Sequence, residues 1–512
     1  MRASLLKRTS RAAAVAAALV VTLALAACAP AIRTESTPAP ADVSAELAPF
    51  YTQVLSWTDC EDGMQCATAT APLDWTDPAR DSIDLALIRH AADNGKPLGS
   101  VLVNPGGPGG SGYDFIADSL SYAVSPTLQK NFDIVGFDPR GVNRSSAVLC
   151  HTDTAQLDAF VYDIVPGEIG SDAWITAAEN TNGAYAQQCL ANTGELLGYV
   201  DTVSAARDLD LLRAVLGDTK LNYLGFSYGT LLGATYAELY PQNTGKLVLD
   251  GALDPTSTSF NVSLTQAEGF ESALRAFLAD CATADDCPFS GSADDSMLKI
   301  RALLDRLDAS PIRATDGREL GSNSMTSAIV LPLYSQENWP YLRQLFASVM
   351  QGDATLAFSL ADSYNGRNPS DGSYIDNSLE ARFAINCLDY ASQGDVAVMR
   401  DQAAQLASLA PVLGKQLAYG DVGCLQWPVK AATERPVIHA VGSADILVVG
   451  TTNDPATPYS WAEALATQLE NGHLVTYDGE GHTAYNKSNS CVDDTVDNFF
   501  VDGTVPASDP LC

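Results

Sequence analysis

The sequence predicts an α/β fold, with a mostly parallel sheet, helices on both faces of the sheet and a helical cap inserted into the chain. Three observations support this prediction. Short apolar runs alternate with helical patterns in two stretches of the chain, a helix-rich stretch separates the two, and a Gly-x-Ser-x-Gly motif follows one apolar run. With 512 residues, 46% of them hydrophobic, the chain can bury a large core.

The apolar runs are expected to be strands because they are short and end in Gly, Pro or Asp. Between the second and third runs, residues 203–216 have apolar residues at helical spacing. A further helix is expected around residues 461–469. The predicted strands are 101–103, 134–137, 221–224, 247–249, 446–449 and 473–477.

The intervening stretch is expected to be an inserted cap. Residues 257–435 contain three candidate helices, at 270–278, 297–307 and 339–350, and few strand patterns. An independent domain is the alternative. Because the sheet pattern resumes afterwards, we expect residues 51–256 and 436–512 to form one core. A smaller insertion is expected at residues 150–200.

The amino-terminal residues predict export and a lipid anchor. Residues 1–27 have a basic start and an uncharged run too short for a membrane span of roughly 20 residues. Leu25-Ala26-Ala27-Cys28 then matches a bacterial lipobox, so Cys28 is the expected lipidation site. An ordinary signal peptide with an incidental cysteine is the alternative. Residues 28–50, rich in Ala, Pro, Thr and Ser, are expected to tether the protein to the cell envelope, from which it could also be released.

The strongly acidic composition limits the expected partners. A formal net charge of −33 repels nucleic acid and anionic lipid headgroups. Contact with the membrane would therefore depend on the acyl anchor. An acidic surface could also favour cationic substrates such as free amino termini, although a role in solubility is the simpler explanation.

The cysteines predict disulfides and no metal site. Besides Cys28 there are ten, an even number, which in an exported chain indicates disulfide bonds. Their spacing suggests sequential pairing, but the sequence leaves the connectivity open. There is no Cys-x-x-Cys, and His151 is the one histidine beside a cysteine, so no zinc site is expected. The ten are Cys60, Cys66, Cys150, Cys189, Cys281, Cys287, Cys387, Cys424, Cys491 and Cys512.

Ser227 is the expected nucleophile. It lies in Gly225-Phe226-Ser227-Tyr228-Gly229, between a predicted strand and a predicted helix. The small flanking residues allow a tight strand-to-helix turn that exposes the hydroxyl, and the helix amino terminus favours developing negative charge. A chance Gly-Ser turn is the alternative, which the position between strand and helix disfavours.

The base and its orienting acid are expected at the carboxyl ends of the last strands, where active sites lie in such sheets. His482 follows the strand 473–477, whereas His473 begins it, and the other histidines precede the candidate acid. Asp454 follows the strand 446–449, whereas Asp445 precedes it. Asp454 could instead cap the next helix. The order Ser, Asp, His favours the triad of Ser227, Asp454 and His482.

The glycine-rich segment 104–112 is expected to form the oxyanion hole. It follows the strand 101–103, and we assign the hole to the backbone amides of Gly107 and Tyr228. The same segment contains Gly-x-Gly-x-x-Gly, with Asp138 after the next strand, so a dinucleotide site is the alternative. Pro108 lacks an N–H where a phosphate would need one, which argues against that site.

Together these motifs resemble α/β-hydrolase serine peptidases of the prolyl iminopeptidase type, and more closely the exported actinobacterial tripeptidyl aminopeptidases. Some lipoprotein members of that group are described as proteases or carboxylesterases. The resemblance extends from about residue 57 to the end and includes segments 104–112, 137–141, 454–458 and 479–483. It implies a cap over the cleft and a carboxylate for the substrate's amino terminus, for which Asp389 in segment 384–389 is the candidate.

The expected reaction is acyl transfer through a covalent intermediate on Ser227, with no metal or organic cofactor. The expected substrates are peptides with free amino termini, from which short peptides are released. A carboxylesterase acting on short-chain esters uses the same residues and is the close alternative. A lipid-anchored binding protein without turnover is the alternative of another class, and the intact triad argues against it.

Overall fold

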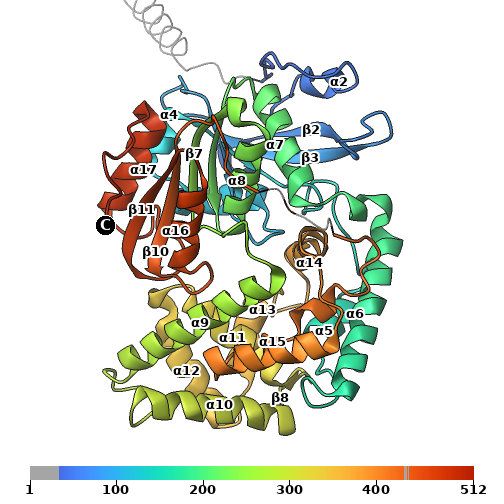
Figure 1. Cartoon of the computed structure of the whole chain (residues 1–512), viewed down its shortest axis with the longest axis vertical. Coiled ribbons are helices and arrows are strands. Elements are labelled where there is room, and N and C mark those ends of the chain that lie inside the picture. The colour runs from blue at the N-terminus through green and yellow to red at the C-terminus, as the bar shows by residue number, and fades with distance from the viewer. Residues whose placement is uncertain (1–33, 432–434, 436) are drawn as a thin grey trace, which may run out of the picture.

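A computed structural model of the chain describes residues 34–431, 435 and 437–512. The predicted signal peptide, Cys28 and the first residues of the predicted tether lie outside the described residues. Figure 1 shows a sheet with flanking helices in the upper part and a layer of helices below it. The predicted α/β fold is confirmed.

The described residues contain a nine-stranded sheet in the order β1-β2-β3-β5-β4-β6-β7-β10-β11. From β5 to β11 all neighbouring strands are parallel, and β1 to β3 extend the sheet as an antiparallel edge. All residues of β4 and β5 are buried, as expected for parallel strands covered on both faces. The strands are β1 (Thr58–Asp59), β2 (Gln65–Pro72), β3 (Ser82–His90), β4 (Ser100–Asn104), β5 (Asp133–Phe137), β6 (Leu221–Phe226), β7 (Thr244–Asp250), β10 (Ile446–Asn453) and β11 (Gly472–Glu480).

Helices cover both faces of this sheet. One core cluster packs α7 and α8 against the sheet, and another packs α3 and α17 against it. Side-chain caps begin several of these helices: Ser111 caps α3, Asp201 caps α7 and Asn489 caps α17. The helices of this part are α2 (Ala48–Tyr51), α3 (Gly112–Ala123), α4 (Pro126–Asn131), α7 (Thr202–Leu216), α8 (Tyr228–Leu239), α16 (Tyr459–Gln468) and α17 (Ser490–Asp502).

The chain between β7 and β10 forms the lower helical layer (Figure 1), which has its own apolar core. The three helices predicted there are present, and the sequence did not reveal α11, α13, α14 or α15. The short strands β8 (Ile312–Arg313) and β9 (Glu319–Leu320) pair with each other. The helices are α9 (Ser259–Cys281), α10 (Ala293–Ala309), α11 (Ser322–Leu333), α12 (Trp339–Met350), α13 (Thr355–Tyr364), α14 (Ser378–Asp389) and α15 (Val396–Leu409).

The smaller predicted insertion is also helical, with α5 (Thr154–Tyr162), α6 (Asp172–Thr193) and the 3₁₀ helix η3 (Gly194–Gly198). Tyr162 packs into the core of the lower helical layer, whereas Tyr185 and Ala186 of α6 and Leu197 of η3 pack into the core cluster that includes the sheet, so this segment contacts both layers. Figure 1 shows α5 and α6 beside α14 and α15.

Residues 34–50 differ from the free tether that their composition suggested. The N–H of Ala39 donates to Ala214 O at 2.7 Å, the N–H of Trp57 donates to Thr34 O at 2.8 Å, and Ala39 is buried. This part of the predicted tether therefore packs on α7 and on the start of the core. A composition rich in Ala, Pro, Thr and Ser is typical of linkers. Such small residues also allow the backbone to approach another segment closely, and composition alone does not distinguish the two cases.

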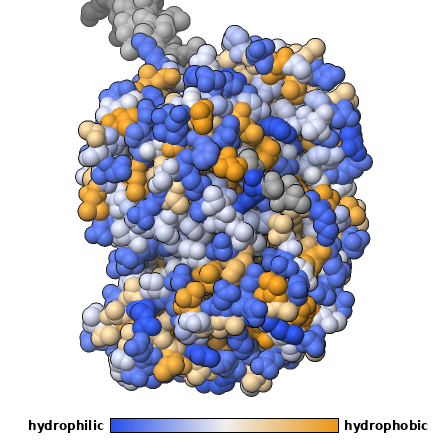
Figure 2. Space-filling model, in the orientation of Figure 1, coloured by the Kyte–Doolittle hydropathy of each residue, from blue (hydrophilic) through white to orange (hydrophobic). Residues whose placement is uncertain are grey.

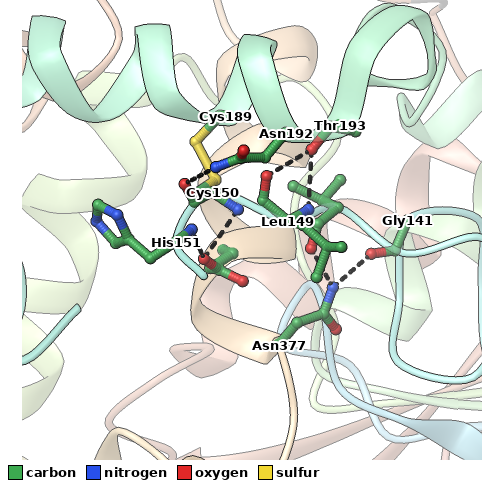
Figure 3. The surroundings of a disulfide bond; sticks show 10 residues. Gly141, Leu149, Cys150, His151, Cys189, Asn192, Thr193 and Asn377 are labelled. Carbon is green, nitrogen blue, oxygen red and sulfur yellow. Dashed lines mark hydrogen bonds between the residues drawn. A yellow bond between two sulfur atoms is a disulfide. The ribbon is translucent and has the colours of Figure 1, made fainter. Parts of the chain in front are cut away.

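In the described ranges, five disulfides join cysteines that follow one another in the sequence, in the sequential order that the spacing suggested. The Cys150–Cys189 bond ties the loop after β5 to α6 (Figure 3). In the same loop, Leu149 exchanges hydrogen bonds of 2.8 Å with the Thr193 hydroxyl, and Asn192 Nδ2 donates to Cys150 O. The loop therefore forms a fixed support, on which α14 begins.

The start of α14 is attached to this support by two side chains. Asn377 Nδ2 donates to the carbonyl oxygens of Gly141 and Val148, both at 2.8 Å (Figure 3). The Glu380 carboxylate accepts the N–H groups of Cys150 and His151 at 3.0 and 2.8 Å. In Figure 1, α14 lies between the sheet and the lower helices.

Apolar side chains on the face shown in Figure 2 form small groups scattered among polar ones. Among the described residues, no helix combines the length and the hydrophobicity needed to cross a membrane.

Candidate active site

Ser227 occupies the sharp turn between β6 and α8. Its φ of 55° is unusual for a residue other than glycine and indicates local strain of the kind found at functional sites. The residues two positions before and after Ser227 must be glycines. A Cβ on Gly225 would lie 2.4 Å from Gly229 O, and one on Gly229 would lie 2.8 Å from Asn104 Oδ1. The Gly-x-Ser-x-Gly pattern is therefore explained by close backbone packing.

Asp454 and His482 meet at the carboxyl ends of β10 and β11. His482 Nδ1 lies 2.9 Å from both carboxylate oxygens of Asp454. The carboxylate is buried and also accepts the N–H groups of Ala456 and Thr457, at 2.9 and 2.8 Å, and the Thr457 hydroxyl at 2.9 Å. These donors hold the carboxylate in one orientation, so the imidazole has a fixed partner.

Four parallel strands end together here. Phe226 of β6 pairs in register with Asp250 of β7, and Val449 of β10 pairs with Asp250 from the other side. At the end of β10, Asn453 pairs with Glu480 of β11. Because parallel strands end at the same edge of the sheet, Ser227, Asp454 and His482 emerge from neighbouring strands, as the sequence analysis expected.

Asp250 connects these strand ends. Its carbonyl oxygen accepts the Ser227 N–H at 2.9 Å, and its buried carboxylate accepts the N–H groups of Ala484 and Tyr485 at 2.8 to 3.0 Å. The next residue, Gly251, lies against the imidazole, since a Cβ there would be 3.2 Å from His482 Cε1. The Asp250–Gly251 peptide therefore contacts both the serine turn and the histidine loop.

The lower helical layer also positions His482. The His482 N–H donates to Tyr334 O at 2.8 Å, and the Tyr334 ring meets the imidazole edge to face, with centroids 5.3 Å apart. Tyr334 follows α11. The orientation of His482 thus depends on contacts from both layers.

The glycine loop lies directly on the serine turn. A Cβ on Gly106 would be 2.9 Å from Ser227 Cβ and 3.0 Å from the Tyr228 nitrogen. Gly107 lines the same cavity as Ser227 and Tyr228. The Asp138 carboxylate accepts the Ser111 hydroxyl at 2.5 Å and the N–H groups of Tyr113 and Arg144. Its acceptor positions are thus occupied within the protein, which leaves little for the ribose contact that a dinucleotide site would need.

A cavity of about 580 Å³ opens above Ser227. Its walls come from both layers: Gly107, Pro108 and Tyr228 from the sheet side, and residues of α9, α11 and α14 from the helical side. Two lining residues among those described are charged, Arg382 of α14 and Asp421 of the 3₁₀ helix η6 (Gly420–Gly423). A cavity of this volume, lined by both polar and apolar residues, suits one short chain-like ligand.

Asp389, the candidate for binding an amino terminus, does not line this cavity. Its buried carboxylate accepts the Thr202 N–H at 2.9 Å and the Thr202 hydroxyl at 2.5 Å. Thr202 Oγ1 lies 2.5 Å from Tyr228 Oη. Because the Thr202 proton goes to the carboxylate, the Tyr228 hydroxyl donates to Thr202. Burial raises the pKa of Asp389 to about 7.

The other histidines lie elsewhere. His473 Nε2 is 2.8 Å from Asp445 Oδ1 at the amino ends of β11 and β10, opposite the Asp454–His482 pair. His90 contacts Asp93, and His439 Nδ1 is 3.0 Å from Gln468 O. His151 packs against Tyr185 and Phe160. No cluster of potential metal ligands occurs in the part of the chain that the structure describes.

Sequence reasoning missed three residues that shape this site. Thr457 belongs to a quoted motif, yet nothing in the pattern assigned its hydroxyl to Asp454. Asp250 ends a predicted strand, and Tyr334 lies beyond the sheet pattern altogether. An Asp at the end of a strand next to the serine strand was the available signal for Asp250, whereas the Tyr334 contact depends on how the two layers pack.

Comparison with known proteins places this geometry in a family. The model of the TAP-like protein family matches residues 410–512. Serine protease Hip1 of Mycobacterium tuberculosis is 35% identical over 485 residues, which cover 91% of this chain and 92% of the relative. Carboxylesterase B of the same organism is 35% identical over 480 residues, or 91% of each chain.

A third relative has an aminopeptidase name. Tripeptidyl aminopeptidase of Streptomyces lividans is 30% identical over 470 residues, which cover 90% of this chain and 86% of the relative. The resemblance inferred from the motifs is therefore confirmed over nearly the whole described chain. The chain belongs to the TAP-like family of α/β-hydrolase serine hydrolases, together with these proteases, esterases and tripeptidyl aminopeptidases.

Proposed function

We propose that the protein is an exported aminopeptidase that releases short peptides, of the tripeptidyl type, from free amino termini. Ser227 attacks the scissile carbonyl, His482 accepts the serine proton and returns it to the leaving amine, and Asp454 orients His482. The amides of Gly107 and Tyr228 stabilise the oxyanion. The Asp454–His482 contact beside the strained Ser227 turn is the observation that carries the proposal.

An aminopeptidase must bind an ammonium group, and Asp421 is the carboxylate available to do so. It is the acidic residue among the described residues lining the cavity. Burial raises its pKa, and hydrogen bonds from the Ser259 side chain and the Gln393 backbone oppose this rise. No ion pair joins it to a described residue, so it can pair with a substrate. We therefore assign to Asp421 the role that the sequence analysis gave to Asp389.

The limited volume of the cavity supports an exopeptidase rather than an endopeptidase. Helices α9, α11 and α14 cover the space above Ser227, which leaves about 580 Å³ for a ligand. An endopeptidase must accommodate polypeptide chain on both sides of the scissile bond, which such a volume does not allow. A short peptide whose ammonium group contacts Asp421 and whose scissile carbonyl lies at Ser227 would fit this volume.

We further propose that the protein acts outside the cytoplasm, anchored through Cys28 to the cell envelope. The lipobox supports the anchor, and five disulfides support an oxidising compartment.

A carboxylesterase is the second candidate, favoured by the relative named carboxylesterase B. The same acyl transfer cleaves esters, whose leaving groups depart more easily. Asp421 separates the two candidates: an esterase for neutral short-chain esters gains nothing from a carboxylate at the cavity wall.

A fluorophosphonate probe tests the nucleophile. We expect the wild-type protein to be labelled and Ser227→Ala to be unlabelled. Equal labelling of both would refute the assignment. Tripeptide p-nitroanilides with free and acetylated amino termini, assayed beside p-nitrophenyl butyrate, then test the substrate class. Cleavage of the free peptides but not of the acetylated ones supports the aminopeptidase, and preference for the ester supports the alternative.

A further inference from the structure

Arg382 is a cation without a partner inside the cavity. No hydrogen bond, ion pair or cation–π contact joins its guanidinium to another residue in the ranges that the structure describes. Other arginines of the lower layer are paired: Arg318 with Asp362, Arg343 with Asp286 and Arg367 with Asp158. In a chain with a net charge of −33, an unpaired arginine at a cavity wall is available for an anion.

Arg382 stands over the oxyanion loop. A Cβ on Gly109 would lie 2.9 Å from the Arg382 nitrogen and 2.4 Å from Ser378 O, so the first turn of α14 rests directly on that loop. Arg382 and Tyr334 line the same cavity as Ser227. Burial raises the pKa of Tyr334, and the positive charge of Arg382 opposes this rise. The Tyr334 ring contacts His482. The cavity that Arg382 lines therefore includes the residue that contacts His482.

The helix that carries Arg382 is held rigidly. Asn377 and Glu380 attach its start to the Gly141–His151 loop by four hydrogen bonds of 2.8 to 3.0 Å (Figure 3 shows the Asn377 contacts). The Asp389 carboxylate attaches its end to Thr202. A specificity residue needs such support, because a charge on a mobile element selects weakly.

We propose that Arg382 selects substrates whose leaving group carries a carboxylate, so that the preferred substrates are short free peptides from which a carboxyl-terminal residue departs. This inference rests on the proposed aminopeptidase function and names its substrate class. Asp421 binds the ammonium end of the peptide, and Arg382 binds its carboxylate end. The two charges of the cavity then match the two ends of a zwitterionic peptide.

The chemistry balances without further reactants. Ser227 Oγ forms a bond to the scissile carbonyl carbon while the C–N bond breaks, and the serine proton passes through His482 to the departing nitrogen. The carboxylate is unchanged and stays paired with the guanidinium, which offers two parallel N–H donors. Water then hydrolyses the acyl-enzyme. An anionic leaving group would otherwise be repelled by the acidic protein.

A set of substrates with a common Ala-Ala-Ala acyl group tests the proposal. The set has five members in all. Their leaving groups are alanine, alanine amide, aspartate α-amide with a free side-chain carboxylate, aspartic acid diamide with both carboxyl groups as amides, and p-nitroaniline. We expect wild-type kcat/KM to favour alanine over alanine amide by about 10- to 100-fold, the range of a charge-assisted hydrogen bond. Arg382→Gln should abolish this preference. Its kcat/KM should fall less for the p-nitroanilide than for the alanine peptide, since an uncharged leaving group makes no such pair.

Two further variants keep the test decisive. Arg306→Gln, an exposed position on α10 outside the cavity, should behave as wild type. Arg382→Lys keeps the positive charge and should retain part of the preference for the alanine peptide. This variant provides the test if Arg382→Gln folds poorly. Cleavage of the aspartate α-amide as fast as of the alanine peptide would assign the contact to any carboxylate of the leaving residue. Equal cleavage of acid and amide by the wild type, or an undiminished preference in Arg382→Gln, overturns the proposal. Failure of the wild type on the p-nitroanilide would instead refute the aminopeptidase function.

Discussion

Asp250 O accepts the Ser227 N–H at 2.9 Å while the Asp250 carboxylate holds the backbone that follows His482. One residue thus sets the separation of the serine turn and the histidine loop. Burial raises the pKa of Asp250, and the nearby charge of Lys487 opposes this rise. The ionised carboxylate is the form that can accept both N–H groups.

Asp250→Asn should therefore lower kcat more than it raises KM. The amide offers an N–H group where two backbone donors need acceptors, so the histidine loop shifts while the cavity stays intact. An unsatisfied buried group costs about 1 to 3 kcal/mol, which should also lower the melting temperature. Steady-state kinetics and thermal unfolding check both effects. An unchanged kcat in a variant with a lowered melting temperature would show that Asp250 only stabilises the fold.

The two aspartate–histidine pairs on β10 and β11 provide a matched comparison. Asp454→Asn should reduce kcat by on the order of 10⁴-fold, the loss seen when such an acid becomes an amide and the imidazole takes the wrong tautomer. Asp445→Asn removes the equivalent acid from His473 at the opposite ends of the same strands and should leave kcat unchanged. Equal losses in both variants, measured on one tripeptide p-nitroanilide, would contradict the assignment of the acid.

Asp389 should give the enzyme a pH dependence near neutrality. Its pKa of about 7 means that the carboxylate accepts the Thr202 hydroxyl above this pH, whereas below it the protonated acid can donate and reverse the chain to Tyr228. Asp201 raises this pKa further, and Arg435 opposes the rise. We expect the profile of kcat/KM against pH to contain an ionisation near 7 that Asp389→Asn lacks. Superimposable profiles would exclude this role.

The same group affects stability in a defined direction. The folded protein binds the Asp389 proton up to a higher pH than the unfolded chain, in which the carboxyl has its ordinary pKa near 3.8. The contribution of Asp389 to the free energy of unfolding is therefore fully present below about pH 4 and is lost as the pH rises to about 7. Asp389→Asn should show a shallower decline of melting temperature over this interval.

The glycines of the serine turn should tolerate no side chain. Gly225→Ala places a Cβ 2.4 Å from Gly229 O, so it should yield little folded protein and no fluorophosphonate labelling. Gly198→Ala is the control, because its Cβ would meet nothing closer than Val429 at 3.6 Å. Expression level, circular dichroism and labelling of the two variants decide the comparison. A well-folded, labelled Gly225→Ala would contradict the close packing described for the turn.

Local patterns predicted the parallel part of the sheet because its strands are short apolar runs in the sequence, most of them buried, although β11 is only partly buried. The ends of those strands also indicated Ser227, Asp454 and His482. The antiparallel edge β1 to β3 went unrecognised, since its strands alternate buried and exposed residues only in part. Asp389 was assigned to the cavity from a motif alone. Its side chain instead contacts Thr202 at the start of α7, and no local sequence pattern shows where α7 lies relative to α14.

The Cys387–Cys424 bond joins α14, which carries Arg382, to the residue that follows η6, which carries Asp421. Arg382 and Asp421 therefore lie on segments that are covalently linked, and this link restricts the distance between the two charges. A peptide one residue too long or too short can satisfy one charge but not both. Selection for peptide length in this enzyme would thus depend on an oxidising environment. A reductant that opens this disulfide would weaken the selection and leave the acyl transfer on Ser227 unchanged.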